Sequence, residues 1–192
     1  MPIIVAYQES WPAEFRTIAA AQRQALGALA WRVDHIGSTA VPGLPAKDVI
    51  DVQVSVAALD GPAMAAISAA LGAIGYSRAE EISRDHRPPN AAGPDEDWAK
   101  LFFRPPPGQR RTHTHVRVWG RPNQRYPLLF RDYLRAHPST AAAYAELKRR
   151  LAANLADPAT YPDVKDPAVD LIYLAAEEWA ATTGWRLGPP DA

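Results

Sequence analysis

Residues 35–54 constrain the fold more than any other stretch of this chain; they read HIGSTAVPGLPAKDVIDVQV. The stretch contains the end of a predicted strand, a Gly-Ser turn, a loop rich in proline and glycine, and a second strand that carries Asp51. Glycine lets main-chain N–H groups come close to a ligand, and proline stiffens the chain between them. Asp51 would then lie on a rigid strand, so we expect this stretch to form an active-site or binding platform.

The second strand of this stretch is the clearest secondary-structure signal. In residues 49–56, Asp51, Gln53 and Ser55 alternate with valines. Successive side chains of a strand point to opposite faces, so these three polar side chains should share one face. Another strand is predicted at residues 31–36.

Helices and strands alternate up to Gly120, and helices alone follow. The other predicted elements of the first part are helices at 10–30 and 60–72, a loop at 83–97, and strands at 98–104 and 112–119. Three further helices are predicted at 128–136, 138–155 and 166–183. The expected fold class is α/β (α+β), with a mixed sheet flanked by helices. Residues 1–120 would form the core, and residues 121–192 a helical region packed on it in a single compact unit.

The composition excludes several classes of function. The chain has no cysteine, which excludes disulfides, cysteine zinc sites and cysteine nucleophiles. Lys+Arg and Asp+Glu both number 21, so bulk charge makes a nucleic-acid partner improbable. No apolar run reaches membrane-spanning length, and the N-terminus lacks the pattern of a signal peptide. We therefore expect a cytoplasmic protein without a membrane partner, and the oligomeric state stays open.

Gly37-Ser38 and Asp51 follow the order of a nucleotidyltransferase active site: a strand, Gly-Ser, a short loop, and a strand with an acid. The turn presents a hydroxyl and N–H groups to phosphate oxygens, and the strand acid holds Mg²⁺ or Mn²⁺. Such sites carry two acids two residues apart, but the second position here is Gln53. An amide oxygen can contact a metal without neutralising a second cation. Asp51 and Gln53 are therefore predicted ligands of one Mg²⁺, and a two-metal site is not expected.

Several segments along the chain carry a family resemblance. They are residues 35–39, 41–44, 46–47, 50–51, 111–116, 129–138 and 144–148. Over them, and so over nearly its whole length, the chain resembles the GrpB family, a family of uncharacterised function in the nucleotidyltransferase superfamily. The resemblance implies a nucleotidyltransferase-like α/β core with a C-terminal helical region. Related domains are found fused behind dephospho-coenzyme A kinase in some bacteria, and the family has no settled reaction. Asp48 departs from the pattern, since proline is common there; it is either a ligand or a solvated residue.

His113 and His115 lie in one of these motifs and are two residues apart, so on a strand they face the same way. Two imidazoles at this spacing can contact phosphate or bind a transition metal, although two histidines alone are a weak metal signal. The alternative is that they are hydrogen-bonded structural residues. With Asp51, they are the predicted catalytic residues.

The predicted nucleotide- or phosphate-binding residues include the turn and two basic side chains. They are Gly37, Ser38, Thr39, Lys47 and Arg131. Lysine acts on phosphate as a point charge, and arginine forks onto it with two donors. For Arg131 a structural ion pair is an equal alternative, and Lys148 is expected at the surface.

These residues support two main functional hypotheses. The first is an enzyme that transfers a nucleotidyl group from a nucleoside triphosphate to a small acceptor with Mg²⁺, by positioning and charge neutralisation. The second is a module that binds a nucleotide or coenzyme A precursor without catalysis, which the amide at Gln53 favours. A different phosphate-dependent enzyme built on the same pocket is a third possibility.

Overall fold

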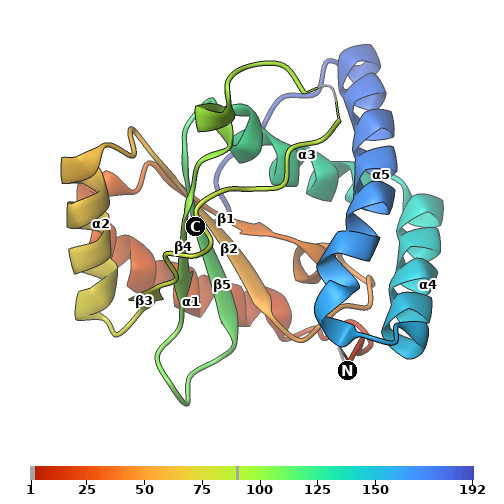
Figure 1. The fold of residues 1–192 in the computed structure, drawn as a ribbon, viewed down its shortest axis with the longest axis horizontal. Helices are drawn as coiled ribbons and strands as arrows, with labels where there is room; N and C mark the ends of the chain where they lie inside the picture. Colours follow the sequence, from red (N-terminus) through yellow and green to blue (C-terminus); the bar gives the residue numbers. More distant parts are fainter. Residues whose placement is uncertain (1–2, 90) are drawn as a thin grey trace.

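One mixed β-sheet forms the centre of the computed structural model, which describes residues 3–89 and 91–192 (Figure 1). Its strands are β1 (Arg32–Ile36), β2 (Ile50–Val56), β3 (Ser77–Arg78), β4 (Leu101–Arg104) and β5 (Thr112–Val118). Within the described residues they pair in the order β1-β2-β5-β4-β3. The central strands β2 and β5 are parallel to each other, and the remaining pairs are antiparallel.

The register of the two central strands aligns the polar residues of the sequence motifs. Asp51 of β2 lies opposite His113 of β5, and Gln53 lies opposite His115. Because side chains alternate along both strands, these four residues share one face of the sheet. The register therefore brings two distant motifs together.

Helices cover both faces of the sheet (Figure 1). They are α1 (Trp11–Leu26), α2 (Gly61–Ala73), α3 (Pro122–Ala136), α4 (Pro138–Asn154) and α5 (Tyr161–Thr183). Val52 and Val54 of β2 pack into one apolar core with α1 and α2. A second core joins α3, α4 and α5 with Val41 and Leu44 of the loop that precedes β2. No helix of the described residues is long and apolar enough to cross a membrane.

The predicted mixed α/β fold with C-terminal helices is confirmed, while two helix starts are wrong. Helix α3 begins at Pro122 instead of residue 128, and α5 begins at Tyr161 instead of residue 166. In α5 the expected first-turn proline, Pro167, lies inside the helix. It lies on an exposed face, where water can satisfy the carbonyl that lacks its N–H partner. The division at residue 120 stays a prediction, and Asn90 of the predicted loop lies outside the described residues.

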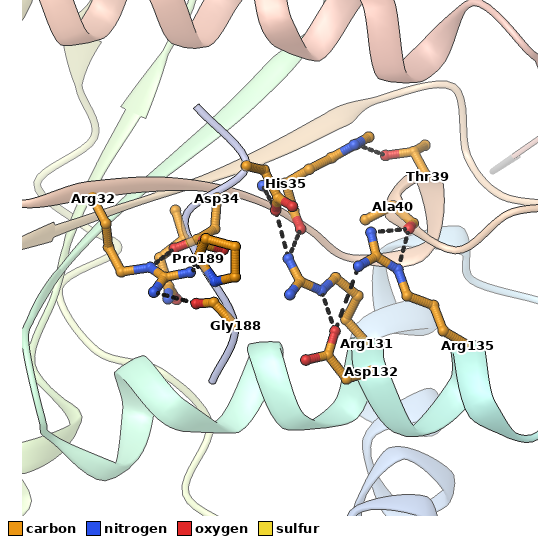
Figure 2. A network of polar contacts seen from close by, with 12 residues as sticks. Arg32, Asp34, His35, Thr39, Ala40, Arg131, Asp132, Arg135, Gly188 and Pro189 are labelled. Atoms are coloured by element: carbon orange, nitrogen blue, oxygen red, sulfur yellow. Dashed lines mark hydrogen bonds and ion pairs between the residues drawn. The ribbon is translucent and has the colours of Figure 1, made fainter. Parts of the chain in front are cut away.

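The last residues of the chain lie along the outer edge of β1 (Figure 2). The Ala192 N–H donates to the Val33 carbonyl over 3.2 Å, and the His35 N–H donates to the Asp191 carboxylate over 3.0 Å. Arg32 donates to the main-chain carbonyls of residues 188 and 189 at 3.0 and 3.1 Å. Residues 188–192, which we call the tail, therefore occupy hydrogen-bonding groups that an edge strand leaves unpaired.

His35 makes the stability of the fold depend on pH. Its ring stacks on Phe15 at 4.6 Å, and Nε2 lies 3.0 Å from the Thr39 hydroxyl. Burial lowers the pKa of His35 from 6.5 to about 4. The unfolded chain therefore binds a proton that the folded chain excludes. The stability that this difference contributes is fully present above pH 6.5 and is lost as the pH drops toward 4. Urea unfolding should show a loss of about 2 kcal/mol from pH 7 to pH 5 through this group.

The variant His35→Gln tests this assignment. It should remove that part of the acid-dependent loss, because glutamine has no titratable ring. His137→Gln should keep the loss, because it leaves His35 in place. An unchanged pH slope in His35→Gln would assign the acid sensitivity to other groups.

Candidate functional site

A pocket of about 260 Å³ lies where the Gly-Ser turn, the start of β2 and the helices α4 and α5 meet. Six of the predicted site residues line it: Gly37, Ser38, Thr39, Lys47, Asp51 and His113. They come from the loop between β1 and β2, from β2 itself and from β5. The strand, Gly-Ser, strand layout predicted from the sequence thus forms one wall of a real cavity.

Gly37 is required by the close approach of the Asp51 carboxylate. Its φ is +71°, a left-handed conformation that glycine adopts without steric cost. A Cβ at this position would lie 2.3 Å from Oδ2 of Asp51. Any other residue would therefore displace the carboxylate, and the turn is matched to the acid.

Asp51 and His113 form a pair at the mouth of the pocket. Nδ1 of His113 lies 3.2 Å from Oδ1 of Asp51, as the register of β2 and β5 requires. The His113 ring packs against Phe102, with ring centres 5.2 Å apart. His113 remains 47% exposed and Asp51 26% exposed, so both side chains can reach a ligand.

Three lysines line the pocket together with this single carboxylate: Lys47 from the loop before β2, Lys148 from α4 and Lys165 from α5. The Lys47 ammonium lies 3.8 Å above the ring of Tyr161, and Nζ of Lys165 lies 3.3 Å from Oδ1 of Asp166. Burial lowers the pKa of Lys47, as do the neighbouring charges of Lys165 and Arg111. The pocket therefore concentrates positive charge where it is only partly hydrated.

Lys148 is a pocket residue that the sequence reasoning missed, because we expected it at the surface. Its side chain is almost fully buried, and Nζ donates to the Ser38 hydroxyl over 2.9 Å and to the Pro45 carbonyl over 2.5 Å. Burial, helped by the charges of Lys165 and Arg149, lowers the pKa of Lys148 to about 7. A signal was present in the sequence: Tyr144 lies four residues before Lys148 on α4, so both share one helix face, and both line the pocket.

Two predicted residues, Gln53 and His115, lie outside the pocket lining. Gln53 is fully buried; its Oε1 accepts from Arg117 over 2.6 Å, and its Nε2 donates to the Gln124 carbonyl over 2.9 Å. Nδ1 of His115 is 3.1 Å from the Arg117 guanidinium and 3.4 Å from the Lys100 ammonium. The structure thus does not bring Gln53 and His115 together with Asp51 around one ligand.

Arg131 also lies away from the pocket, although it was predicted to contact phosphate. Its guanidinium donates to the His35 carbonyl over 2.9 Å, to Asp191 over 2.6 Å and to Asp132 over 2.7 Å (Figure 2). It is 5% exposed. These bonds tie α3 to β1 and to the tail, which is the structural alternative weighed for this residue.

A buried charge network adjoins the pocket on the same face of the sheet. The Asp85 carboxylate accepts hydrogen bonds from Arg117 (Nε and Nη2, both 2.7 Å), Lys100 (2.7 Å) and Asn123 (3.1 Å). Despite its burial, the charges of Arg117 and Lys100 hold the pKa of Asp85 well below its usual range. The network anchors the start of the loop at 83–97 to β5, to α3 and to Lys100, the residue before β4.

The donor set of the pocket restricts which metal could bind. Among the described residues, no group of three or more His, Asp or Glu side chains could hold a metal ion. Asp51 is the one carboxylate in the lining, since Asp48 binds Trp11 and Arg110 outside the pocket. Mg²⁺ is commonly held by one or two carboxylates together with substrate phosphates. The residues therefore fit a single Mg²⁺ that arrives with a phosphorylated ligand, and do not fit a metal held by protein alone.

Comparisons with known proteins agree over most of the chain. A family model described as GrpB protein matches residues 2–174. Dephospho-CoA kinase of Mycobacterium leprae is 40% identical in an alignment of 196 positions. The alignment covers 92% of this chain and 47% of that protein. UPF0157 protein YqkA of Bacillus subtilis is 31% identical in an alignment of 194 positions. The alignment covers 98% of this chain and 49% of that protein. The chain thus spans about half the length of these relatives.

One solved structure is similar along its whole length. The crystal structure of the conserved protein GrpB from Enterococcus faecalis superposes with a TM-score of 0.73 at 30% sequence identity. The match covers 92% of this chain and 99% of that chain. The sheet and helices described above are therefore shared with that protein.

Proposed function

The chain belongs to the GrpB family, and we propose that its pocket binds a nucleotide or another phosphate-bearing small molecule. The observation that supports this most is the convergence of Lys47, Lys148 and Lys165 on a pocket with one carboxylate. Ammonium groups are frequent phosphate ligands, and the Ser38 hydroxyl adds a neutral donor. A bound phosphate would also favour the protonated form of Lys148.

The size of the pocket suggests which part of the ligand it holds. Its volume of about 260 Å³ is just below the range of roughly 300–1,000 Å³ usual for complete small-molecule sites. We infer that the phosphate groups enter, while the remainder of the ligand lies over the mouth near Asp51 and His113. The walls of Tyr144 and Tyr161 then provide apolar contact beside the charged groups.

The reaction that fits this arrangement best is nucleotidyl transfer to a small acceptor. An acceptor hydroxyl attacks the α-phosphorus, a new P–O bond forms, and the bond to the departing pyrophosphate breaks. The lysines and Ser38 would hold the triphosphate, and His113 would take the acceptor proton. Asp51, together with phosphate oxygens, would hold one Mg²⁺, which supplies charge neutralisation at the phosphates when bound.

A non-catalytic role in binding is the second candidate, and the lone carboxylate favours it. Gln53 is committed to Arg117 and Gln124, so it leaves Asp51 without a second metal ligand from β2. The name dephospho-CoA kinase belongs to relatives about twice as long as this chain, so we assign no kinase activity to it. Dephospho-coenzyme A is still a ligand worth testing, because those relatives carry its name.

The two candidates are separated by measuring binding and turnover together. Calorimetric titration with each nucleoside triphosphate, dephospho-coenzyme A and inorganic tripolyphosphate, with and without Mg²⁺ or Mn²⁺, reports binding. Release of pyrophosphate in the presence of cell metabolites reports turnover. If transfer occurs, Asp51→Asn should lower the rate at least about a hundredfold, because it removes the charge that holds the metal.

Asp48→Asn is the matched control, since it removes a nearby acid that does not line the pocket, and it should leave turnover unchanged. Binding without pyrophosphate release in any mixture would favour the binding module. Failure of every phosphate compound to bind would overturn the proposal as a whole.

A further inference from the structure

A second and larger cavity lies on the other side of α5. It is a groove of about 1140 Å³ between α5, the start of α3 and the loop that leads to Trp98. It shares no lining residue with the phosphate pocket among the described residues. Its walls are largely apolar, with Pro88 and Trp98 on one side and Leu171 and Leu174 on the other.

Helix α5 presents two adjacent stripes along this groove. At 3.6 residues per turn, its acidic positions form one stripe and its apolar positions form the next. The acidic stripe is Asp163, Asp166, Asp170 and Glu177. In the apolar stripe, Leu171 is 69% and Leu174 is 57% exposed. Two large side chains left so open beside a cavity indicate a surface that a partner covers.

The charge of the groove is negative. Four carboxylates line it against the guanidinium groups of Arg121 and Arg125 and the ring of His86, whose Nε2 lies 3.0 Å from Asp170. Arg125 is already hydrogen-bonded to Glu177, and Arg121 lies 3.7 Å from Asp97. Asp166 is 3.3 Å from the Lys165 ammonium, so among the described residues Asp163 is the carboxylate of the acidic stripe that has no ion-pair partner. A cationic partner is therefore the one that the groove complements.

The dimensions of the groove exceed those of an ordinary small-molecule site. Its volume, about 1140 Å³, lies above the usual range of roughly 300–1,000 Å³ for such sites. The acidic stripe runs from residue 163 to residue 177, a length of about 21 Å at 1.5 Å per residue. A peptide helix of about four turns has this length, and helices commonly bind in such grooves through one apolar face.

We propose that this groove binds an amphipathic helical segment of a partner protein, with leucine-like side chains on one face and lysine or arginine beside them. The apolar face would cover Leu171 and Leu174, and the basic side chains would meet the acidic stripe. This site is independent of the phosphate pocket, so either proposal can fail without the other.

The test uses a fluorescein-labelled helix of Leu and Lys, about four turns long, titrated with the full chain by fluorescence anisotropy. Leu171→Ser with Leu174→Ser should weaken binding at least about tenfold, because the apolar surface of both leucines that the peptide would bury is then missing. Asp163→Asn with Asp166→Asn should weaken it by about threefold or more and reduce its salt dependence. All four positions line the groove and none lines the phosphate pocket. Because Asp166 is 3.3 Å from the ammonium of Lys165 in that pocket, Asp163→Asn alone is the charge variant that leaves the phosphate pocket unchanged.

Matched controls remove the same chemistry elsewhere on the surface. Ile3→Ser with Trp31→Ser removes two exposed apolar side chains, and Glu9→Gln with Glu80→Gln removes two exposed charges; both should bind like the parent protein. Equal losses in control and groove variants would overturn the proposal, as would equal binding of a Leu/Glu helix. Sedimentation that shows a dimer converted to monomer by the leucine variant would make the face a self-interface and also overturn it.

Discussion

Replacing Lys148 by methionine should weaken the binding of inorganic tripolyphosphate by at least about tenfold at pH 6, the cost of losing one charged hydrogen-bond donor. The pKa of Lys148 is lowered to about 7, so the amine is mostly charged at pH 6 and mostly neutral at pH 8. The advantage of the parent protein over the variant should therefore shrink as the pH rises from 6 to 8. Calorimetry on both proteins at the two pH values isolates this effect, because titration of the ligand itself affects both equally.

Loss of affinity in this variant should not come from loss of folding. Lys148 is buried without a carboxylate partner among the described residues, and methionine fills a similar volume without an amine to desolvate. The free energy of unfolding should fall by no more than about 2 kcal/mol, because the bonds to Ser38 and the Pro45 carbonyl are lost while the cost of burying the amine is also removed. Arg150→Met, two positions along the same helix and exposed, is the control and should bind like the parent. Equal affinity of Lys148→Met and parent at both pH values would contradict the role assigned to this lysine.

Replacing Asp85 by alanine should lower the free energy of unfolding by about 3–5 kcal/mol, because it leaves two buried cations without their shared partner. Arg117 and Lys100 are 5% and 8% exposed, and both depend on this carboxylate. Urea unfolding followed by circular dichroism at pH 7 measures the change.

The control for this effect is Asp95→Ala. Asp95 forms ion pairs with Arg84 and Arg87 on the same loop, but its side chain is 62% exposed. Its loss should change the free energy of unfolding by less than about 1 kcal/mol. Similar losses in the two variants would mean that burial of the Asp85 network contributes nothing to stability.

The local pattern of the sequence was sufficient to predict one wall of the site. Alternation in residues 49–56 predicts β2 and the face on which Asp51 lies, since the pleat of a strand is a local property. It does not separate Asp51 from Gln53, because both share that face. Along a strand the two are about 7 Å apart. Over that distance the surroundings change from an open pocket to a face covered by α3, where Gln53 bonds to Gln124.

The opposite wall depends on packing that local patterns do not encode. Lys148 contacts Ser38 across 110 residues of sequence, through the packing of α4 against the loop after β1. Its spacing from Tyr144 indicates a shared helix face, but not whether that face is buried. The start of α5 was predicted wrongly from Pro167. Proline only prefers the first turn of a helix, and α5 continues through this one. Site residues contributed by helices were therefore the hardest to predict.

The position of the tail affects how the molecule behaves toward other copies of itself. An uncovered edge strand is a template on which a second chain can extend the sheet. One edge of this sheet is β1, whose main-chain groups at Val33 and His35 are occupied by the tail. The other edge is β3, which is only two residues long. The described part of the molecule therefore exposes few unpaired main-chain groups at which a second copy could extend the sheet. The residues that cover β1 lie beyond the family match at 2–174.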